Sequence, residues 1–102
     1  MGQYFNVSAT HKEDHVVLEV SFGLPGNNSE IIKSALEDLE KLDLKGGPLL
    51  KIDGPCTLPA AFAIADKVKH LFAAVAVFDP KMSGFVVAIS SGSGFNPGDL
   101  IQ

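Results

Sequence analysis

Residues 53–81, DGPCTLPAAFAIADKVKHLFAAVAVFDPK, decide the fold. The turn dipeptide Gly54-Pro55 ends the apolar run at residues 49–52, which reads as a strand. Thr57 suits a helix N-cap, and Pro59 is tolerated in a first helical turn because its missing N–H would be unpaired there. The stretch therefore predicts a strand, a tight turn and a helix that begins near Pro59.

The rest of this stretch predicts a long helix followed by a buried strand. Apolar residues recur at helical spacing over residues 59–72 and form one broad face, which we expect to be buried: Ala61, Phe62, Ile64, Ala65, Val68, Leu71 and Phe72. Residues 73–78 are apolar at every position, as in a strand covered on both faces. Ligands of open α/β sheets bind at the edge where parallel strands finish. Asp53, Asp79 and Lys81 are therefore expected to converge near that edge.

The remaining elements complete one domain over residues 1–102. Residues 3–9 and 15–22 predict two antiparallel strands. Asn27 or Asn28 caps a further helix, with Glu30 in capping-box register to Asn27. Residues 85–89 predict a strand that forms a hairpin with residues 73–78, and the apolar end of residues 95–101 re-packs on the sheet. The order ββαβαββ indicates an α+β fold, a mixed sheet with two helices.

Composition argues against one class of function. The chain has 102 residues and a net charge of −4, from 8 basic and 12 acidic residues, and every basic residue is lysine. Proteins that grip long duplex nucleic acid normally show a basic face and use arginine to bind phosphate. The sequence therefore disfavours that class. It leaves room for a small anionic ligand held by backbone amides, a few lysines and a metal.

The sequence also predicts a cytoplasmic protein without membrane contact. No apolar run approaches the roughly 20 residues that a membrane helix needs. Residues 1–4 lack the basic and apolar regions of a secretory signal. The single cysteine, Cys56, cannot form an internal disulfide, which fits a reducing compartment. Cys56 could be a nucleophile, but a small buried residue is the better interpretation because no motif places a histidine partner beside it.

Asp66 and His70 are the first candidate metal ligands. They lie four residues apart on the predicted helix, so their side chains are neighbours, and Asp79 could approach from the strand end. Two carboxylates and one imidazole suit Mn²⁺, or Mg²⁺, and the imidazole nitrogen favours Mn²⁺. The alternative is a solvated helix face, since Lys67 and Lys69 flank the pair.

Two further features have a functional and a structural interpretation. Asp79 could ligate a metal or orient a base, or it could simply end the strand together with Pro80. Ser90 and Ser91 open a run rich in glycine and serine whose backbone amides could hold a phosphate, although no helix follows it. The residues alone do not decide between these alternatives.

Several segments resemble one known family: G-P, A-D-K-V-K-H, A-V-A-V-F-D-P-K, V-V-A-I-S-S and P-G-D-L-I. They are similar to the small CRISPR-associated ring nucleases of type III systems, a family also found fused to kinase-like domains in cyanobacteria. The resemblance implies a ferredoxin-like sheet akin to the sensor domains (CARF-type) for cyclic oligoadenylate. It also implies a homodimer, or a ligand-bridged tetramer, that cleaves cyclic tetra-adenylate with Mn²⁺ and so switches off type III antiviral signalling.

The resemblance assigns roles to individual residues. His70 matches the family histidine that acts as general base or metal ligand, and Asp79 matches the aspartate that orients it or ligates metal. Lys81, usually an arginine, would hold the phosphate. Asp53, Gly54, Pro55, Ser90 and Ser91 would line the ligand site.

Three positions depart from the family pattern, and they leave other functions open. Asp66 stands where a further histidine is common, Asp53 replaces a polar or basic residue, and Ser91-Gly92 replaces a histidine after the last strand. The alternatives are a non-catalytic cyclic-oligoadenylate-binding or dimerisation module of a longer fusion protein, and a Mn²⁺-dependent RNA deadenylating exonuclease.

Overall fold

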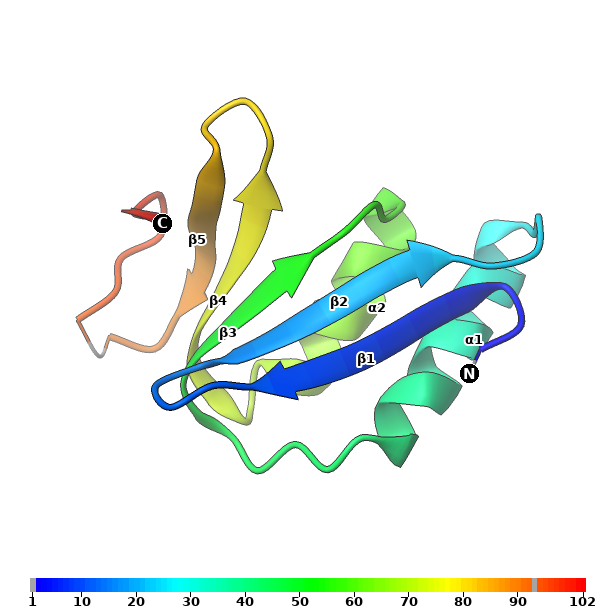
Figure 1. Cartoon of the computed structure of the whole chain (residues 1–102), viewed down its shortest axis with the longest axis horizontal. Coiled ribbons are helices and arrows are strands. Elements are labelled where there is room, and N and C mark those ends of the chain that lie inside the picture. The colour runs from blue at the N-terminus through cyan, green and yellow to red at the C-terminus, as the bar shows by residue number, and fades with distance from the viewer. Residues whose placement is uncertain (1, 93) are drawn as a thin grey trace.

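The computed structural model describes residues 2–92 and 94–102. Six strands form one sheet in the order β1-β2-β3-β4-β5-β6, and two helices pack on it (Figure 1). The strands are β1 (Phe5–His11), β2 (Val16–Phe22), β3 (Gly47–Asp53), β4 (Phe72–Asp79), β5 (Gly84–Ser90) and β6 (Leu100–Ile101), and the helices are α1 (Asn28–Lys41) and α2 (Leu58–Val68).

The sheet is mixed, and both helices cover the same face of it. β2, β3 and β4 run parallel to one another, whereas β1–β2, β4–β5 and β5–β6 are antiparallel pairs. The connections through α1 and α2 both advance across the sheet in one direction, and right-handed crossovers then place both helices on one side. Figure 1 shows them together behind the strands. The expected α+β fold, a mixed sheet with two helices, is confirmed.

The main core lies between the helices and the sheet. Alternate residues of the strands point towards the helices, as the pleat requires. Its buried members from the sheet are Phe5, Val7, Val16, Leu18, Val20, Leu50, Ile52, Phe72 and Val75, and those from the helices are Ile31, Ala35, Leu39, Ala60, Ile64 and Val68. This core fixes the register of the parallel strands and therefore the positions of both of their ends.

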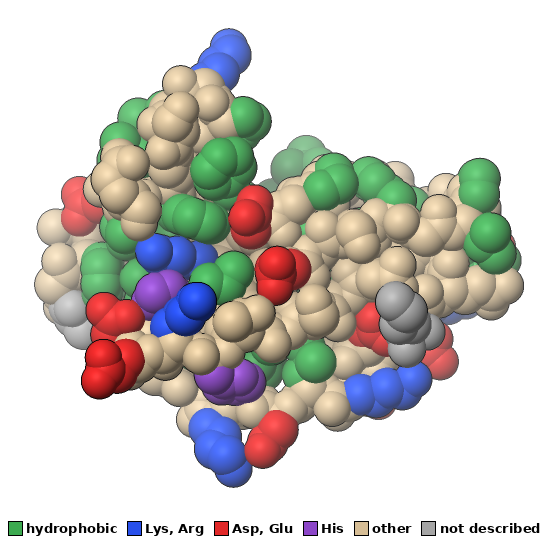
Figure 2. Space-filling model, in the orientation of Figure 1, with side chains coloured by type: hydrophobic (Ala, Val, Ile, Leu, Met, Phe, Trp, Pro, Cys, Tyr) green, Lys and Arg blue, Asp and Glu red, His purple; other side chains and the backbone are tan. Residues whose placement is uncertain are grey.

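A second, smaller cluster lies on the opposite face of the sheet. Leu49, Ala74, Ala76 and Val87 are buried there, and Phe85, Phe95 and Ile101 pack against them. Phe95 and Ile101 come from the last residues of the chain, so the expected re-packing of that end on the sheet is confirmed. The face beyond this cluster, over β1 to β3, carries acidic, lysine and histidine side chains (Figure 2).

Both helices begin as expected, but α2 ends early. Asn27 and Glu30 form the capping box with two hydrogen bonds of 2.9 Å, and the Thr57 hydroxyl accepts a hydrogen bond from the Ala60 N–H at 3.3 Å. The prediction of a helix to residue 72 is wrong, because α2 ends at Val68 and Phe72 pairs with Gly47 as the first residue of β4. Strand pairing thus overrides the helical spacing of the last apolar residues.

The buried face of α2 is also narrower than the sequence predicts. Ala60, Ile64 and Val68 pack into the core, whereas Phe62 is 69% exposed and Leu71 is 43% exposed. The prediction that Phe62 and Leu71 are buried is therefore wrong. Within residues 2–92 and 94–102, neither helix is long and apolar enough to cross a membrane.

Candidate functional site

The first group of candidate residues lies where the parallel strands finish. Asp53 is the last residue of β3 and Asp79 is the last residue of β4. Because the two strands are parallel neighbours, their carboxyl ends lie at one edge of the sheet. By the alternation of the pleat, Asp53 shares the open face with Lys51 and Ala76, whereas Asp79 shares the helix face with Val75 and Val77. The two carboxylates therefore reach the same edge from opposite faces.

Gly54 makes the turn after β3 possible. Its φ angle is +124°, and a Cβ at this position would lie 2.0 Å from the carbonyl oxygen of Val20 in the neighbouring strand. Only glycine fits such a conformation and such a close approach. The backbone of Gly54 therefore lies closely against β2 at this edge.

Asp79 organises the turn that carries Lys81. Its Oδ1 atom accepts a hydrogen bond from the backbone N–H of Lys81 at 2.9 Å, and its carbonyl oxygen accepts one from the Met82 N–H at 3.2 Å. Ser83 follows with a φ angle of +52°, and Gly84 begins the return strand. Lys81 is exposed at the tip of the β4–β5 hairpin. This edge therefore presents an ammonium group on a turn that a carboxylate fixes.

The second group of candidate residues lies where β4 begins, at the other end of the sheet. His70 is exposed in the turn between α2 and β4. Ser90 pairs with Ala74 near the start of β4, and the Ser91 N–H donates to the Ala73 carbonyl at 2.8 Å. The Ser90 hydroxyl donates to the Phe95 carbonyl, and the Ser91 hydroxyl donates to the Ala73 carbonyl at 3.2 Å. Both serine hydroxyls thus hold the chain in place at this end.

The expected metal site does not form within one chain. β4 has 8 residues, and at a rise of about 3.3 Å per residue roughly 23 Å separate its first and last residues. His70 precedes the first and Asp79 is the last, so the two side chains cannot bind one ion. Among the described residues, no three side chains of histidine, cysteine, aspartate or glutamate gather closely enough to hold a metal. The prediction that Asp66, His70 and Asp79 form one site in a single chain is therefore wrong.

Asp66 and His70 do not form the expected helical pair. His70 lies beyond the end of α2, and the carboxylate of Asp66 instead makes an ion pair of 3.0 Å with the Lys69 ammonium. The hydrogen bond and charge of Lys69 hold the pKa of Asp66 below its usual value, and the charge of His70 contributes less. The solvated-face interpretation therefore describes Asp66 better.

Comparison with known proteins agrees with the resemblance seen in the sequence. The model of the CRISPR-associated protein family Cas_csx3 matches residues 27–102, which is more than half of the chain. The chain belongs to the Cas_csx3 family. No curated protein matches it. The family match runs from the cap of α1 to the last residue, so it includes every candidate residue at both ends of the sheet.

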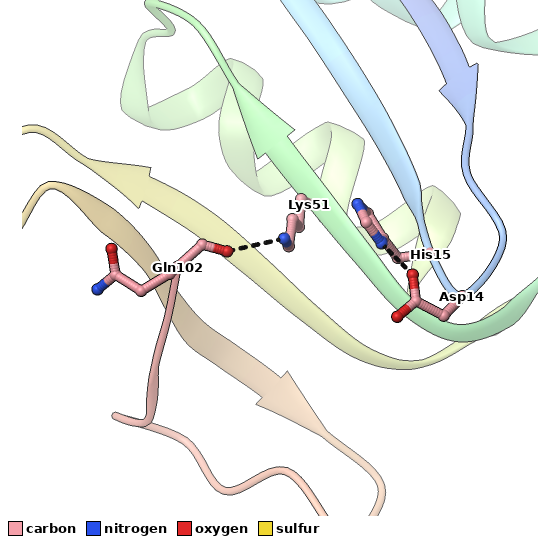
Figure 3. Close-up of polar contacts among 4 residues, drawn as sticks. All are labelled: Asp14, His15, Lys51 and Gln102. Atoms are coloured by element: carbon pink, nitrogen blue, oxygen red, sulfur yellow. Dashed lines mark hydrogen bonds and ion pairs between the residues drawn. The ribbon is translucent and has the colours of Figure 1, made fainter.

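This Cas_csx3 chain also has a buried lysine that no motif in its sequence indicates as a site residue. Lys51 lies on the open face of β3 and is only 9% exposed. Its ammonium group donates to the Gln102 carbonyl at 3.1 Å (Figure 3). The same group lies 5.1 Å from the centre of the Phe85 ring. The signal in the sequence that could have indicated a buried lysine is its position as the one charged residue inside the otherwise apolar run Leu49–Ile52. Lys51 thus holds Gln102 on the sheet, whereas the ammonium group of Lys81 is exposed.

A hydrogen-bonded pair of a histidine and an aspartate lies close to Lys51 in the same Cas_csx3 chain. His15 and Asp14 make a contact of 2.7 Å, and this hydrogen bond is the main reason why the pKa of Asp14 is below its usual value (Figure 3). His15 precedes β2, and His11 ends β1 at the same end of the sheet. All three histidines of the chain therefore lie at the end of the sheet where β4 begins.

Proposed function

We propose that this protein is a ring nuclease that binds and cleaves cyclic tetra-adenylate at a site shared between copies of the chain. One observation carries the proposal: the histidine and the phosphate-binding lysine lie at opposite ends of β4. A ligand that needs both groups must contact the His70 end of one copy and the Lys81 end of another. Membership of a CRISPR-associated family supports the choice of cyclic oligoadenylate as the ligand.

The proposed chemistry uses a nucleophile that the ligand itself supplies. His70 of one copy takes the proton of a ribose 2′-hydroxyl, and the resulting 2′-oxygen attacks the adjacent phosphorus. The bond from phosphorus to the 5′-oxygen breaks, the 5′-oxygen takes up a proton, and a 2′,3′-cyclic phosphate remains on the linear product. His70 is exposed in the turn after α2, so its imidazole can rotate to meet this hydroxyl.

Lys81 of the second copy supplies the positive charge. Its ammonium group would bind a non-bridging phosphate oxygen, where charge accumulates as the 2′-oxygen attacks. Asp79 supports this role by accepting the Lys81 backbone N–H at 2.9 Å, which fixes the turn beneath the ammonium group. Asp53, Gly54 and Pro55 lie at the same edge and would contact the ligand beside Lys81.

The described part of one chain gathers no set of side chains that would hold the expected Mn²⁺, so no step of this proposal passes through the metal. Asp66 is paired with Lys69, and Asp79 lies at the far end of β4 from His70. The requirement for Mn²⁺ stays a prediction. Cleavage that is equal in Mn²⁺ and in a chelator would rule it out, whereas cleavage in Mn²⁺ alone would support donors shared between copies.

A non-catalytic binding module is the second candidate. It is favoured by the serine hydroxyls at the His70 end, which donate to backbone carbonyls instead of pointing freely at a ligand. Such a module would still use Lys81 and the turn at Gly54-Pro55 to hold the ring. It would bind cyclic tetra-adenylate without shortening it.

The experiment incubates the protein with labelled cyclic tri-, tetra- and hexa-adenylate, with Mn²⁺ and with a chelator, and separates the products. We expect linear products with a cyclic phosphate end from the tetra-adenylate. Binding without cleavage in every condition would make the protein a sensor. A lack of binding to all three rings would contradict both candidates.

A further inference from the structure

Two phenylalanine rings meet at the end of the sheet where the parallel strands finish. Phe78, the residue before the last of β4, lies directly across from Phe85 of β5. The ring centres are 5.3 Å apart and the ring planes meet at 67°, which is an edge-to-face contact. Phe85 packs against the small cluster on the open face, whereas Phe78 is 39% exposed. The pair therefore holds one aromatic ring in place and leaves part of that ring accessible to a ligand.

Carboxylates lie beside this ring on the same face of the sheet. Lys51 of β3 pairs with Ala76 of β4, so Asp53 and Phe78, two residues further along each strand, project from the open face at the same level. Glu19 of β2 is the register partner of Asp53, and both carboxylates line a polar hollow of about 440 Å³. Among the described residues, neither carboxylate forms an ion pair. The hollow beside the aromatic ring therefore offers hydrogen-bond acceptors with a negative charge.

A carboxylate at this edge has to meet a hydrogen-bond donor of the ligand. The phosphates of cyclic tetra-adenylate are negative and would be repelled by Asp53. The only donors of this ligand are its ribose 2′-hydroxyls and the N6 amino groups of its adenines. Carboxylates accept hydrogen bonds from exocyclic amino groups of nucleobases, and the flat face of a base stacks on an aromatic ring. Only an adenine base therefore satisfies both the carboxylate of Asp53 and the ring of Phe78.

The β4–β5 hairpin also carries the lysine that is proposed to bind phosphate. Lys81 follows Phe78 by three residues, and its backbone N–H donates to the Asp79 carboxylate at 2.9 Å. Figure 2 shows the molecule hollowed between this hairpin and the ends of the neighbouring strands, with acidic side chains at the foot of the hairpin. The positive charge thus lies at the tip and the negative charges lie deeper. A nucleotide has the complementary order when its phosphate is at the tip and its amino group points inwards.

We infer that one adenine base of the ring stacks on Phe78 and donates its N6 amino group to the Asp53 carboxylate, while Lys81 holds a phosphate. The inference rests on the proposed function and adds to it the contacts that recognise the base. Phe78 and Asp53 touch the base and none of the reacting atoms. They therefore determine the affinity for the ligand and the choice of base, whereas the rate of cleavage of the bound ring stays the same.

Equilibrium binding of cyclic tetra-adenylate tests the stacking contact. Phe78→Ala is expected to bind roughly 10- to 100-fold more weakly, the loss of one stacked base, and Phe78→Tyr, which keeps the ring, should bind as the wild type does. Phe22→Ala is the matched control. Phe22 ends β2, is 47% exposed and makes an edge-to-face contact of 5.4 Å with Phe5, but it shares the helix face with Val20. Unchanged binding by Phe78→Ala, or equal weakening in the Phe22→Ala control, would overturn the inference.

A ring in which unsubstituted purine replaces each adenine tests the contact with Asp53, because it lacks the N6 amino groups and keeps the flat bases. The wild type is expected to bind this ring about 10-fold more weakly than cyclic tetra-adenylate, as for one hydrogen bond to a charged group. Asp53→Ala should bind both rings equally, whereas Ser21→Ala, in the same hollow, should keep the preference. Equal binding of both rings by the wild type, or a preference that survives in Asp53→Ala, would overturn the inference and leave the proposed function intact. Failure to bind either ring would reject both.

Discussion

The two ends of the sheet carry different kinds of polar side chain. Where β2, β3 and β4 begin, the chain places all three of its histidines and two serines whose hydroxyls donate to backbone carbonyls. Where these strands finish, it places two carboxylates, an exposed lysine and a glycine turn packed against β2. One end can move a proton and the other can hold an anion. Under the proposed function neither end is a complete site, so a ligand that needs both chemistries has to join two copies.

The largest effect is expected at the histidine end. Replacing His70 by alanine should lower the turnover of cyclic tetra-adenylate by roughly 10²–10⁴-fold, because it removes the proposed general base. Binding should change little, since the imidazole acts on a hydroxyl and not on a phosphate charge. Single-turnover cleavage and equilibrium binding measure the two effects. His11→Ala is the control at the same end, and an equal loss in that variant would deny His70 its special role.

The next largest effect is expected on stability, at the glycine turn of the opposite end. Gly54→Ala should lower the free energy of unfolding by about 2–3 kcal/mol, because the new Cβ would meet the Val20 carbonyl and the backbone would be strained. Gly94 also has a positive φ angle, but a Cβ there has nothing within 4 Å. Gly94→Ala should therefore cost less. Chemical denaturation compares the two, and equal losses would show that the close approach to β2 is unimportant.

Lys81 should affect binding as well as turnover. Removing its ammonium group in Lys81→Ala should weaken binding by about 10- to 100-fold, as expected for one charged hydrogen bond to phosphate. The loss should shrink as salt is added, because screening weakens the same interaction in the wild type. Lys12→Ala, between β1 and β2 at the histidine end, is the control. Unchanged binding by Lys81→Ala would mean that the anion is held elsewhere.

A smaller effect distinguishes two roles of Asp79. If its carboxylate only fixes the turn, Asp79→Asn should retain activity, because the amide oxygen can still accept the Lys81 N–H. Asp79→Ala should lose that bond and about 1 kcal/mol of stability. If Asp79 instead ligates a metal or orients a base, the two variants should be equally impaired. Cleavage rates and melting temperatures of both variants separate these cases.

The fold could be predicted from the sequence because its elements carry local signals. The capping box at Asn27 and Glu30, the turn at Gly54-Pro55 and the unbroken apolar run of β4 each specify structure within a few residues. The end of α2 carries no such signal. No glycine or proline stands between Val68 and Phe72, and the apolar residues up to Phe72 keep the helical spacing. Only the pairing of Phe72 with Gly47 of β3 converts them into a turn and a strand.

The arrangement of the candidate site was predicted only in part, for a related reason. The sequence correctly brought Asp53 and Asp79 to one edge, because parallel strands finish together. The prediction for His70 failed for two reasons. Helical spacing suggested Asp66 as its neighbour, and the prediction took no account of the length of β4, which separates His70 from Asp79. Lys51 was not selected and Phe62 was wrongly expected to be buried, because burial depends on what covers each face. Gln102 lies over Lys51, whereas the described residues leave Phe62 69% exposed.

Mixing two impaired variants, His70→Ala and Lys81→Ala, tests the shared site most directly. His70→Ala keeps an intact lysine end and Lys81→Ala keeps an intact histidine end, so a mixture contains pairings of two intact ends. If the copies meet at random, about a quarter of the sites should be complete, as expected for a head-to-tail interface between different surfaces. We expect the mixed variants to recover up to that fraction of the wild-type cleavage of cyclic tetra-adenylate, while each variant alone does not. A mixture no more active than its components would contradict it.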